Sequence, residues 1–228
     1  MLNFRHLSNY GLWLLLLYAT MGVPVAQENI IVELPQPVLD GKKSLRQLLQ
    51  QRRSVREYSR EALSLAELGQ LLWAAQGISH ARGLRTAPSA GALYPLELYV
   101  VAGNVSGLEP GVYHYQIQQH RLEHQVAGDK RIGLGRASLW QTWMAKAPVI
   151  FVFAAEYERT DKKYGLRAKR YVHMEVGHAA QNLFLQAEDL GLATVVVGAF
   201  DDAVVGELLA LPKEIVPLSF MPVGRKRN

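Results

Sequence analysis

Two clusters of arginine and lysine are the clearest chemical feature of this 228-residue sequence. Arg52, Arg53 and Arg56 lie within five positions, and Arg225–Arg227 form a second cluster near the end of the chain. A guanidinium group presents planar donor pairs that match phosphate oxygens. If the fold brings the two clusters together, they would form a phosphate-binding site. Taken singly, each has a simpler interpretation, as cations at a helix C-terminus or as a solvated chain end.

Two further segments could bring backbone groups close to a flat ligand. Residues 88–95 (PSAGALYP) form a loop of small residues that leads into an expected strand, and small residues let a ligand approach the main chain. Residues 194–200 (TVVVGAF) form an expected strand and the loop after it. The end of such a strand could offer N–H donors to a ligand. An ordinary turn and a plain buried strand are the alternatives.

Composition limits the chemistry that the chain can perform. It has no cysteine, which excludes thiolate zinc sites, iron–sulfur clusters and cysteine nucleophiles. The histidine spacings do not suggest a metal site, because His173 and His178 are five positions apart and would not share a helix face. A net charge of +5 permits an anionic ligand without requiring nucleic acid, and no nucleic-acid partner is expected.

The basic cluster at 52–56 should lie between two helices. Ser44 and Gln47 form a capping-box pattern that predicts a helix from residue 44 to about 53, and Ser64 and Glu67 predict a second helix over 64–77. In this interpretation Arg52 and Arg56 share one helix face, where like charges cost about 0.2–0.5 kcal/mol. A bound anion would offset that cost.

The remaining pattern interleaves strands and helices. Because the order begins with paired helices and shows no regular strand–helix alternation, the expected class is α+β, with one domain built around a mixed sheet. Apolar runs and turn residues predict strands at 96–102, 111–115, 121–124, 149–155, 193–198 and 215–222. Periodic apolar residues predict helices at 137–146, 170–190 and 203–211.

The first 26 residues have the layout of a secretory signal peptide. A short segment with Arg5 precedes an apolar run at 12–23 and small residues toward Ala26. The run is shorter than the roughly 20 apolar residues of a spanning helix, so a cleaved signal is preferred over an uncleaved membrane anchor. The protein is therefore expected to be exported, to the periplasm, or anchored by its N-terminus. Residues 27–44 are interpreted as an extension, and 45–228 as the functional domain.

An ordered set of motifs resembles the FMN-dependent nitroreductase superfamily, and most closely its SagB-type dehydrogenase branch, which includes azoline oxidases. The resemblance covers about residues 45–227, and its motifs are RRSVR at 52–56, PSAGALYP at 88–95, KYG at 163–165, GHAAQN at 177–182 and VVG at 196–198. It implies a nitroreductase-like sheet sandwiched by helices. It also implies a homodimer with an active site at each side of the interface.

The resemblance also implies site residues, all for the cofactor FMN or for catalysis. The phosphate and ribityl chain would be held by Arg52, Arg53, Ser54, Arg56, Arg225 and Arg227. Pro88, Ser89 and Ala90 would pack on the flavin from the other subunit, and Val197 and Gly198 would lie near flavin N5. Lys163 and Tyr164 match a pair that assists proton removal in azoline oxidases; a solvated turn is the alternative.

The implied activity is ping-pong hydride transfer through flavin N5, to or from a small-molecule or peptide substrate. A flavin supplies this chemistry itself, so the protein needs binding and orientation more than a nucleophile. An NAD(P)H-dependent reductase of nitroaromatics or quinones is the first alternative. A non-catalytic flavin-binding module is the second, and a membrane-tethered protein whose basic clusters contact anionic lipid is the third.

Overall fold

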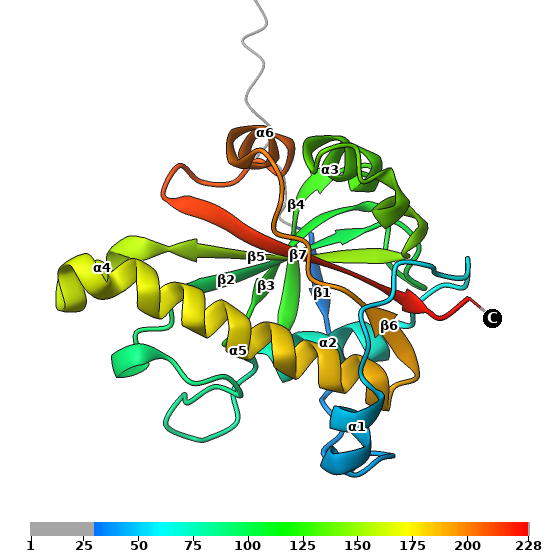
Figure 1. The fold of residues 1–228 in the computed structure, drawn as a ribbon, viewed down its shortest axis with the longest axis horizontal. Helices are drawn as coiled ribbons and strands as arrows, with labels where there is room; N and C mark the ends of the chain where they lie inside the picture. The colour runs from blue at the N-terminus through cyan, green and yellow to red at the C-terminus, as the bar shows by residue number, and fades with distance from the viewer. Residues whose placement is uncertain (1–29, 228) are drawn as a thin grey trace, which may run out of the picture.

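A seven-stranded sheet forms the centre of the fold in the computed structural model, which describes residues 30–227 (Figure 1). The strand order is β1-β4-β3-β2-β5-β7-β6. The strands are β1 (Ile31–Glu33), β2 (Leu96–Ala102), β3 (Gly111–Gln116), β4 (Arg121–Ala127), β5 (Val149–Glu156), β6 (Leu192–Thr194) and β7 (Ile215–Arg225). All six pairings between them are antiparallel, which corrects the predicted mixed sheet. Parallel pairing in residues 30–227 is limited to the isolated bridges Ser54–Thr194 and Leu63–Val105.

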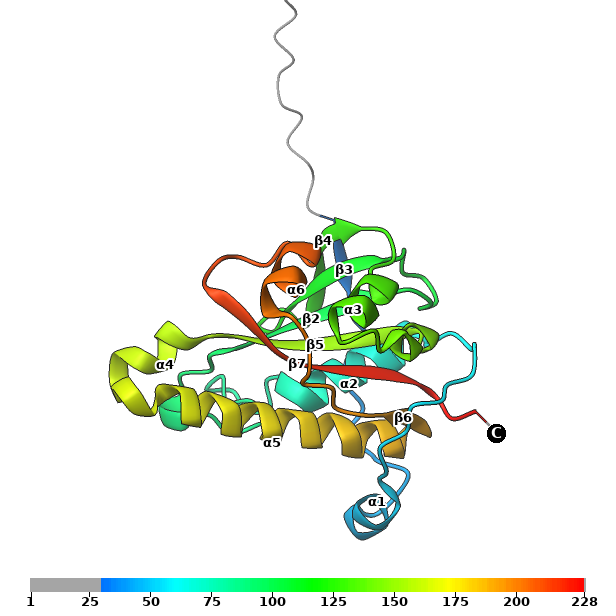
Figure 2. The same cartoon turned by 45° about the horizontal axis from the view of Figure 1, so that its top comes forward.

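Helices cover both faces of this sheet, as expected for the predicted sandwich. Figure 2 shows the long helix α5 below strands β5 and β7, and α3 and α6 above these two strands. The α-helices are α1 (Leu45–Gln51), α2 (Leu65–Gln76), α3 (Arg131–Ala137), α4 (Tyr157–Tyr164), α5 (Ala168–Asp189) and α6 (Asp202–Leu208). Three short 3₁₀ helices are η1 (Ala90–Ala92), η2 (Thr142–Lys146) and η3 (Gly165–Arg167).

Strand β5 explains why the sheet needs a helical layer on each side. Its residues from 149 to 155 are all buried, and alternate side chains enter different cores. Phe151 and Phe153 pack with residues of α2 and α5, whereas Ile150 and Val152 pack with residues of α3 and α6. Side chains alternate across a strand with a period of two. The continuous apolar run at 149–155 therefore produces two separate cores.

Both predicted capping boxes are present. The Ser44 N–H donates to Gln47 Oε1 at 2.9 Å, and the Gln47 N–H donates back to Ser44 Oγ at 3.3 Å. At α2 the Ser64 N–H donates to Glu67 Oε2 at 2.9 Å, and the Glu67 N–H donates to Ser64 Oγ at 3.2 Å. Each box satisfies two donors that a helix start would otherwise leave unpaired. These bonds define the two helix starts on either side of residues 52–60.

The helix predicted over 137–146 is wrong. Helix α3 ends at Ala137, and the chain resumes as the 3₁₀ helix η2 only at Thr142. Between them Leu139 and Trp140 have φ values of 54° and 61°. These left-handed conformations are incompatible with a continuing right-handed helix. Pro148 does follow the end of η2, as the sequence suggested.

The N-terminal part of the domain begins earlier than predicted. Strand β1 lies within the supposed extension of residues 27–44 and pairs with β4, with Val32 opposite Leu122. The predicted boundary at residue 45 therefore does not separate the sheet from the extension. The predicted signal peptide at 1–26 lies outside the described residues. Among residues 30–227, no helix combines the length and apolar character needed to cross a membrane.

Candidate functional site

The fold brings the two basic clusters together along one edge of the sheet. After α1 the chain continues in extended form, and the Val55 N–H donates to the Thr194 carbonyl of β6 at 3.0 Å. Farther along, the Ser59 N–H donates to the Arg225 carbonyl at the end of β7, also at 3.0 Å. Figure 1 shows this segment in cyan beside β6 and the C-terminus. The convergence that the phosphate hypothesis requires is therefore present in the backbone.

Arg52 and Arg56 do not share a helix face, contrary to the prediction. Helix α1 ends at Gln51, so Arg52 is its C-cap and the residues after it are extended. The Arg52 guanidinium lies 5.0 Å from the ring centre of Phe184 on α5, and that of Arg56 lies 5.9 Å from the ring of Trp143 on η2. In the described part of the chain neither side chain has a carboxylate partner.

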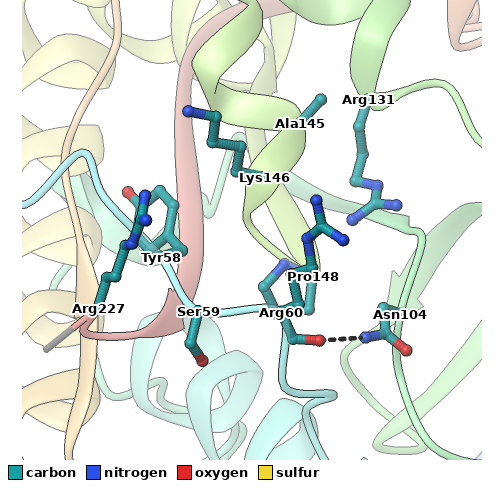
Figure 3. Close-up of a pocket in the computed structure, with 9 residues that line it drawn as sticks. All are labelled: Tyr58, Ser59, Arg60, Asn104, Arg131, Ala145, Lys146, Pro148 and Arg227. Atoms are coloured by element: carbon teal, nitrogen blue, oxygen red, sulfur yellow. Dashed lines mark hydrogen bonds between the residues drawn. The ribbon is translucent and has the colours of Figure 1, made fainter.

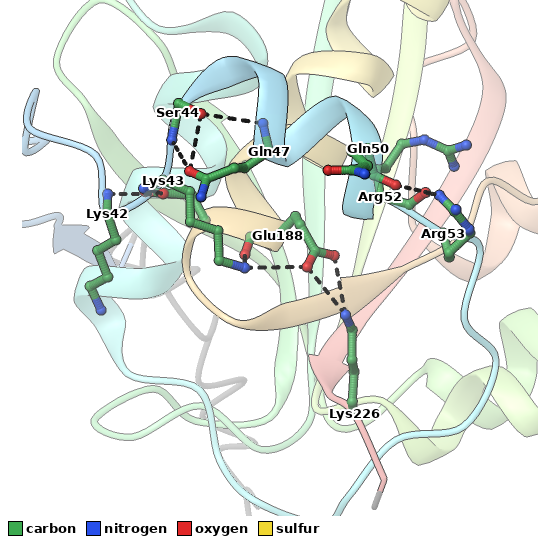
Figure 4. Close-up of polar contacts among 10 residues, drawn as sticks. Lys42, Lys43, Ser44, Gln47, Gln50, Arg52, Arg53, Glu188 and Lys226 are labelled. Atoms are coloured by element: carbon green, nitrogen blue, oxygen red, sulfur yellow. Dashed lines mark hydrogen bonds and ion pairs between the residues drawn. The ribbon is translucent and has the colours of Figure 1, made fainter.

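Arg53 has a structural contact with α1 (Figure 4). Its Nη1 donates to the carbonyls of Gln50 at 2.9 Å and Arg52 at 2.7 Å. A helix leaves its last carbonyls without intrahelical donors, and basic side chains near the C-terminus commonly satisfy them. The helix-end interpretation therefore accounts for Arg53. Ser54, next along the chain, is exposed and forms a bridge to Thr194.

The C-terminal cluster is largely neutralised by glutamates. Arg225 Nη2 lies 2.8 Å from Glu67 Oε1, and its Nε lies 3.0 Å from Glu61 Oε2. Lys226 Nζ lies 3.2 Å from Oε2 of the buried Glu188 (Figure 4). Arg227 differs, because it has no ion pair within residues 30–227 and lies on the wall of a cavity. The three neighbouring cations thus occupy three different environments.

The loop at 88–95 is folded tightly beside Lys163 and Tyr164. Ser89 Oγ accepts a hydrogen bond from the Tyr94 N–H at 2.9 Å, and Gly91 adopts a positive φ of 62°. A Cβ atom placed on Gly91 would lie 2.9 Å from both Lys163 Nζ and Tyr164 Oη. A side chain at position 91 would displace the ends of these two side chains, and the positive φ also favours glycine there. The fold unites two motifs that are about 70 positions apart.

Lys163 and Tyr164 belong to helix α4 rather than to the solvated turn considered above. Arg159, one turn earlier, anchors this helix by donating to the Tyr94 carbonyl at 3.1 Å and by pairing with Glu97 Oε1 at 2.5 Å. Burial alone would raise the pKa of Glu97, but a hydrogen bond with His114 and the charge of Arg159 outweigh it and lower that pKa. Lys163 itself is exposed, so the single chain does not desolvate its amine.

Backbone groups at Val197 and Gly198 are held in place by the neighbouring strand. The Val197 N–H donates to the Phe220 carbonyl at 2.9 Å, and the Phe220 N–H donates back at 2.8 Å. The Val197 side chain is buried, whereas Gly198 is exposed and a Cβ there would meet no atom within 4 Å. Position 198 therefore presents accessible main chain above β7. Pro88 is exposed and Ala90 is partly buried in the loop at 88–95.

Glu175 is a site residue that sequence reasoning missed. It lies on α5 with a relative exposure of 2%, and its Oε1 has no hydrogen-bond partner within residues 30–227. Burial raises the pKa of Glu175 to about 7, although a hydrogen bond with Ser89 and the charge of Arg85 oppose the rise. One signal could have revealed it: Glu175 is three positions after Val172 and four before Ala179, on the apolar stripe of the predicted helix.

The pKa of Glu175 predicts how stability changes with pH. Folding raises it from 4.5, so between pH 4.5 and 7 the folded state retains a proton that the unfolded state releases. That stabilisation is lost as the pH rises through 7. We expect the unfolding free energy of the wild type to fall by about 2 kcal/mol more than that of Glu175→Gln between pH 5 and pH 8. Urea denaturation followed by circular dichroism measures the difference.

Glu158→Gln is the matched control, because Glu158 is an exposed carboxylate on α4. It should follow the wild-type pH dependence. Parallel curves for the wild type and Glu175→Gln would contradict the assignment of a raised pKa to Glu175.

Residues 49–225 match the Nitroreductase family. The chain belongs to the nitroreductase family. Nitroreductase MJ1384 of Methanocaldococcus jannaschii is 48% identical over 197 residues, which cover 86% of this chain and 97% of the relative. The predicted family, sandwich architecture and oxidoreductase class are thereby confirmed at the level of the family.

Two more distant relatives indicate the range of the family. The FMN reductase [NAD(P)H] of Bacillus subtilis is 25% identical over 189 residues, covering 75% of this chain and 61% of the relative. A chain of the Escherichia coli microcin synthetase McbBCD complex, solved with truncated pro-MccB17 bound, superimposes with a TM-score of 0.65 at 26% identity. The superposition covers 91% of this chain and 84% of that chain. Reductases and a peptide-processing enzyme complex thus share the fold.

A metal site has no support in the described residues. No group of three or more His, Asp or Glu side chains within 30–227 is arranged to hold an ion. His120, at the β3–β4 turn, is hydrogen-bonded to Tyr115 Oη at 2.7 Å and to the Pro35 carbonyl at 3.0 Å. These contacts give it a structural role that links the β3–β4 hairpin to the segment after β1.

Proposed function

We propose that this protein is an FMN-dependent oxidoreductase of the SagB-type branch, acting on a small-molecule or peptide substrate. The observation that carries the proposal is the pair Arg52 and Arg56, which belong to the segment along one edge of the sheet and whose guanidinium groups lack carboxylate partners in the described residues. Their neighbours Arg225 and Lys226 are neutralised. Unpaired guanidinium groups suit a phosphate group.

The residues around this edge fit FMN in two other respects. Thr194 Oγ1 is buried beside Ser54 and has no hydrogen-bond partner in the described part of the chain, so a polar group of a ligand could satisfy it. Gly198 exposes main chain with open space above it. Arg52, Ser54 and Arg56 would hold the phosphate and ribityl chain, and Val197 and Gly198 would face the ring. Bound FMN would supply hydride acceptance and donation. Arg225 is left out of the phosphate site because glutamates engage its donors.

The chain's own groups would orient the substrate and move protons. Lys163 and Tyr164 lie against Gly91, so they would act beside the loop at 88–95. The buried carboxyl of Glu175 would hold Ser89 of that loop in position. Because Lys163 is exposed in the single chain, the substrate or a second subunit would have to cover its amine before it could act as a base.

A homodimer with two interfacial sites forms part of the proposal. Leu166 on η3 is fully exposed, and Met174 on α5 is 53% exposed, so apolar surface is available near Lys163 and the loop at 88–95. Apolar surface of this kind is buried when subunits associate. We also propose export or N-terminal anchoring, which rests on the sequence of residues 1–26 alone.

Flavin titration tests the proposed cofactor site. Arg56→Ala should weaken FMN binding at least tenfold, about 1.4 kcal/mol, because a phosphate ligand is removed. The quenching of flavin fluorescence on titration with protein measures the dissociation constant. Arg82→Ala, at an exposed position in the loop after α2, is the control and should bind FMN like the wild type. Unchanged affinity in Arg56→Ala, or no binding by the wild type, would refute the proposed site.

The direction of the reaction has a separate readout. The similarity to an FMN reductase [NAD(P)H] favours a nicotinamide donor, and the similarity to the McbBCD complex favours a peptide substrate. Rapid anaerobic reduction of the FMN-loaded protein by NADH or NADPH would support the reductase alternative.

A further inference from the structure

A basic cavity lies behind the segment that carries the proposed FMN site. Figure 3 shows it between the chain around Tyr58–Arg60, the end of η2 and Arg227, which follows β7. Its volume is about 910 Å³. Small-molecule pockets commonly have volumes of about 300–1,000 Å³. The space is therefore large enough for more than a single inorganic ion.

Positive charge dominates the lining of this cavity. Four of the nine lining residues are cationic, and none is acidic: the cations are Arg60, Arg131, Lys146 and Arg227. Arg60, Lys146 and Arg227 form no ion pair within residues 30–227. Cations gathered in a concave wall repel one another and concentrate their field in the cavity. An anion placed there would relieve that repulsion.

One of the four cations is rigidly built into the wall. Arg131 pairs with Asp129, with Nη2 at 2.7 Å from Oδ2, and its Nη1 donates to the Ala147 carbonyl at 2.6 Å. Its side chain packs so closely on Gly103 that a Cβ there would lie 1.9 Å from Arg131 Cζ. Arg131 is thus an ordered and partly neutralised part of the cavity wall. The net positive charge of the lining comes from the three unpaired cations.

Polar groups complete the donor set. Asn104 Nδ2 donates to the Arg60 carbonyl at 3.0 Å, which fixes the backbone of Arg60 against the next loop (Figure 3). The hydroxyl of Ser59 also lines the cavity. Two arginines, a lysine and a hydroxyl match the oxygens of phosphate groups, because guanidinium binds them in pairs and ammonium contributes a point charge.

The contrast with adjacent residues shows that this charge is not a general property of the chain end. Arg225 and Lys226 both contact glutamates, whereas Arg227 has no ion pair within residues 30–227. Surface cations commonly gain carboxylate neighbours, yet the lining of this cavity has none. The cationic charge of this lining is therefore not balanced by any carboxylate of the lining itself.

We propose that this cavity binds a phosphate-bearing small molecule, at a site separate from the proposed FMN site. Arg60 and Lys146 would bind the phosphate oxygens together with Arg227, which the resemblance implied as an FMN contact and which the structure places on the wall of this cavity. This site is additional to the proposed function and independent of it, because neither Arg60 nor Lys146 is among the proposed FMN ligands.

Calorimetric titration of the purified, FMN-treated protein with inorganic pyrophosphate tests the site. We expect one binding event that weakens at least tenfold in Lys146→Ala and in Arg60→Ala. Lys213→Ala, which removes a charge from the loop before β7, should bind pyrophosphate like the wild type. FMN affinity, measured by fluorescence in the same variants, should remain unchanged.

Three results would overturn the proposal. Pyrophosphate binding that is absent, or equally strong in Lys146→Ala, Arg60→Ala and the wild type, would remove the site. Weaker FMN binding in those variants, or displacement of FMN by pyrophosphate, would assign the cavity to the flavin phosphate instead. Equally tight binding of citrate would show that charge alone, and not phosphate, is recognised. If the protein binds no FMN, the pyrophosphate titration still tests whether this cavity binds phosphate.

Discussion

The substitution Phe220→Ala should lower the free energy of unfolding by about 3–5 kcal/mol, the range for truncating a buried aromatic side chain. Phe220 lies on β7 with no exposed surface, in the core that α3 and α6 cover. Its ring stacks on that of Phe200 with centres 4.2 Å apart. Alanine would leave a cavity between the sheet and the segment after β6. Urea denaturation followed by circular dichroism measures the loss.

The same substitution should also weaken FMN binding if the proposed site is correct. Phe220 exchanges two backbone hydrogen bonds with Val197, so a loosened Phe220 would disorder the main chain at Val197 and Gly198. Phe153→Ala is the matched control: Phe153 is equally buried, on β5, but belongs to the core under α2 and α5. Both variants should lose similar stability. Equal FMN affinities in the two, measured where both are folded, would argue against a flavin above Val197.

Features with a local cause were predictable from the sequence. The capping boxes at Ser44 and Ser64 place two helix starts correctly, because each depends on residues three positions apart. The strand at 96–102 has the predicted limits, and the apolar stripe of α5 predicted the longest helix to within two residues. Short-range patterns encode these elements directly.

Other elements depend on contacts between distant parts of the chain. Helix α4 is rich in charged residues and has no apolar stripe; Arg159 holds it by reaching Glu97 and the Tyr94 carbonyl, more than 60 positions away. Strand β1 has only three residues, and its partner strand β4 lies about 90 positions later. The break after α3 depends on positive φ values that leucine and tryptophan rarely adopt. None of these causes is visible in a local window.

The motifs of the candidate site could be recognised in the sequence. Which of its arginines and lysines lack carboxylate partners could not. The two basic clusters converge because their extended segments pair side by side. The sequence alone could say only that a phosphate site would form if the fold brought the clusters together. Neutralisation of Arg225 by Glu61 and Glu67 could not be foreseen, since Glu67 was assigned to a helix cap, Glu61 lies in the loop before that helix, and both are more than 150 positions from Arg225. Glu175 escaped attention because a single acidic residue on an apolar stripe is easily taken for a boundary residue. Tertiary structure therefore changes which cations are free to bind an anion.

If the proposed SagB-type activity is correct and is an azoline oxidation, Lys163→Ala should reduce turnover of a thiazoline-containing dipeptide about 100-fold or more, the effect of removing a general base. In that reaction the ring would lose one hydride, which bound FMN would accept, and one proton, which a base would accept; molecular oxygen would then reoxidise the flavin. Lys163 Nζ and Tyr164 Oη lie together against Gly91, so they would receive the proton beside the loop at 88–95. FMN should remain bound, because Lys163 is not among the proposed phosphate ligands. Absorbance of the azole product measures turnover.

Lys162→Ala is the control for the loss of charge. Lys162 is the preceding residue on α4, is exposed, and pairs with Glu158 at 3.3 Å, so its removal should leave turnover unchanged. NADH adds a second internal comparison. A hydride donated by NADH requires no proton removal by the protein, so anaerobic reduction of the bound flavin should be equally fast in Lys163→Ala and the wild type. Full dipeptide turnover in Lys163→Ala, or an equal loss in both assays, would show that Lys163 is not the base.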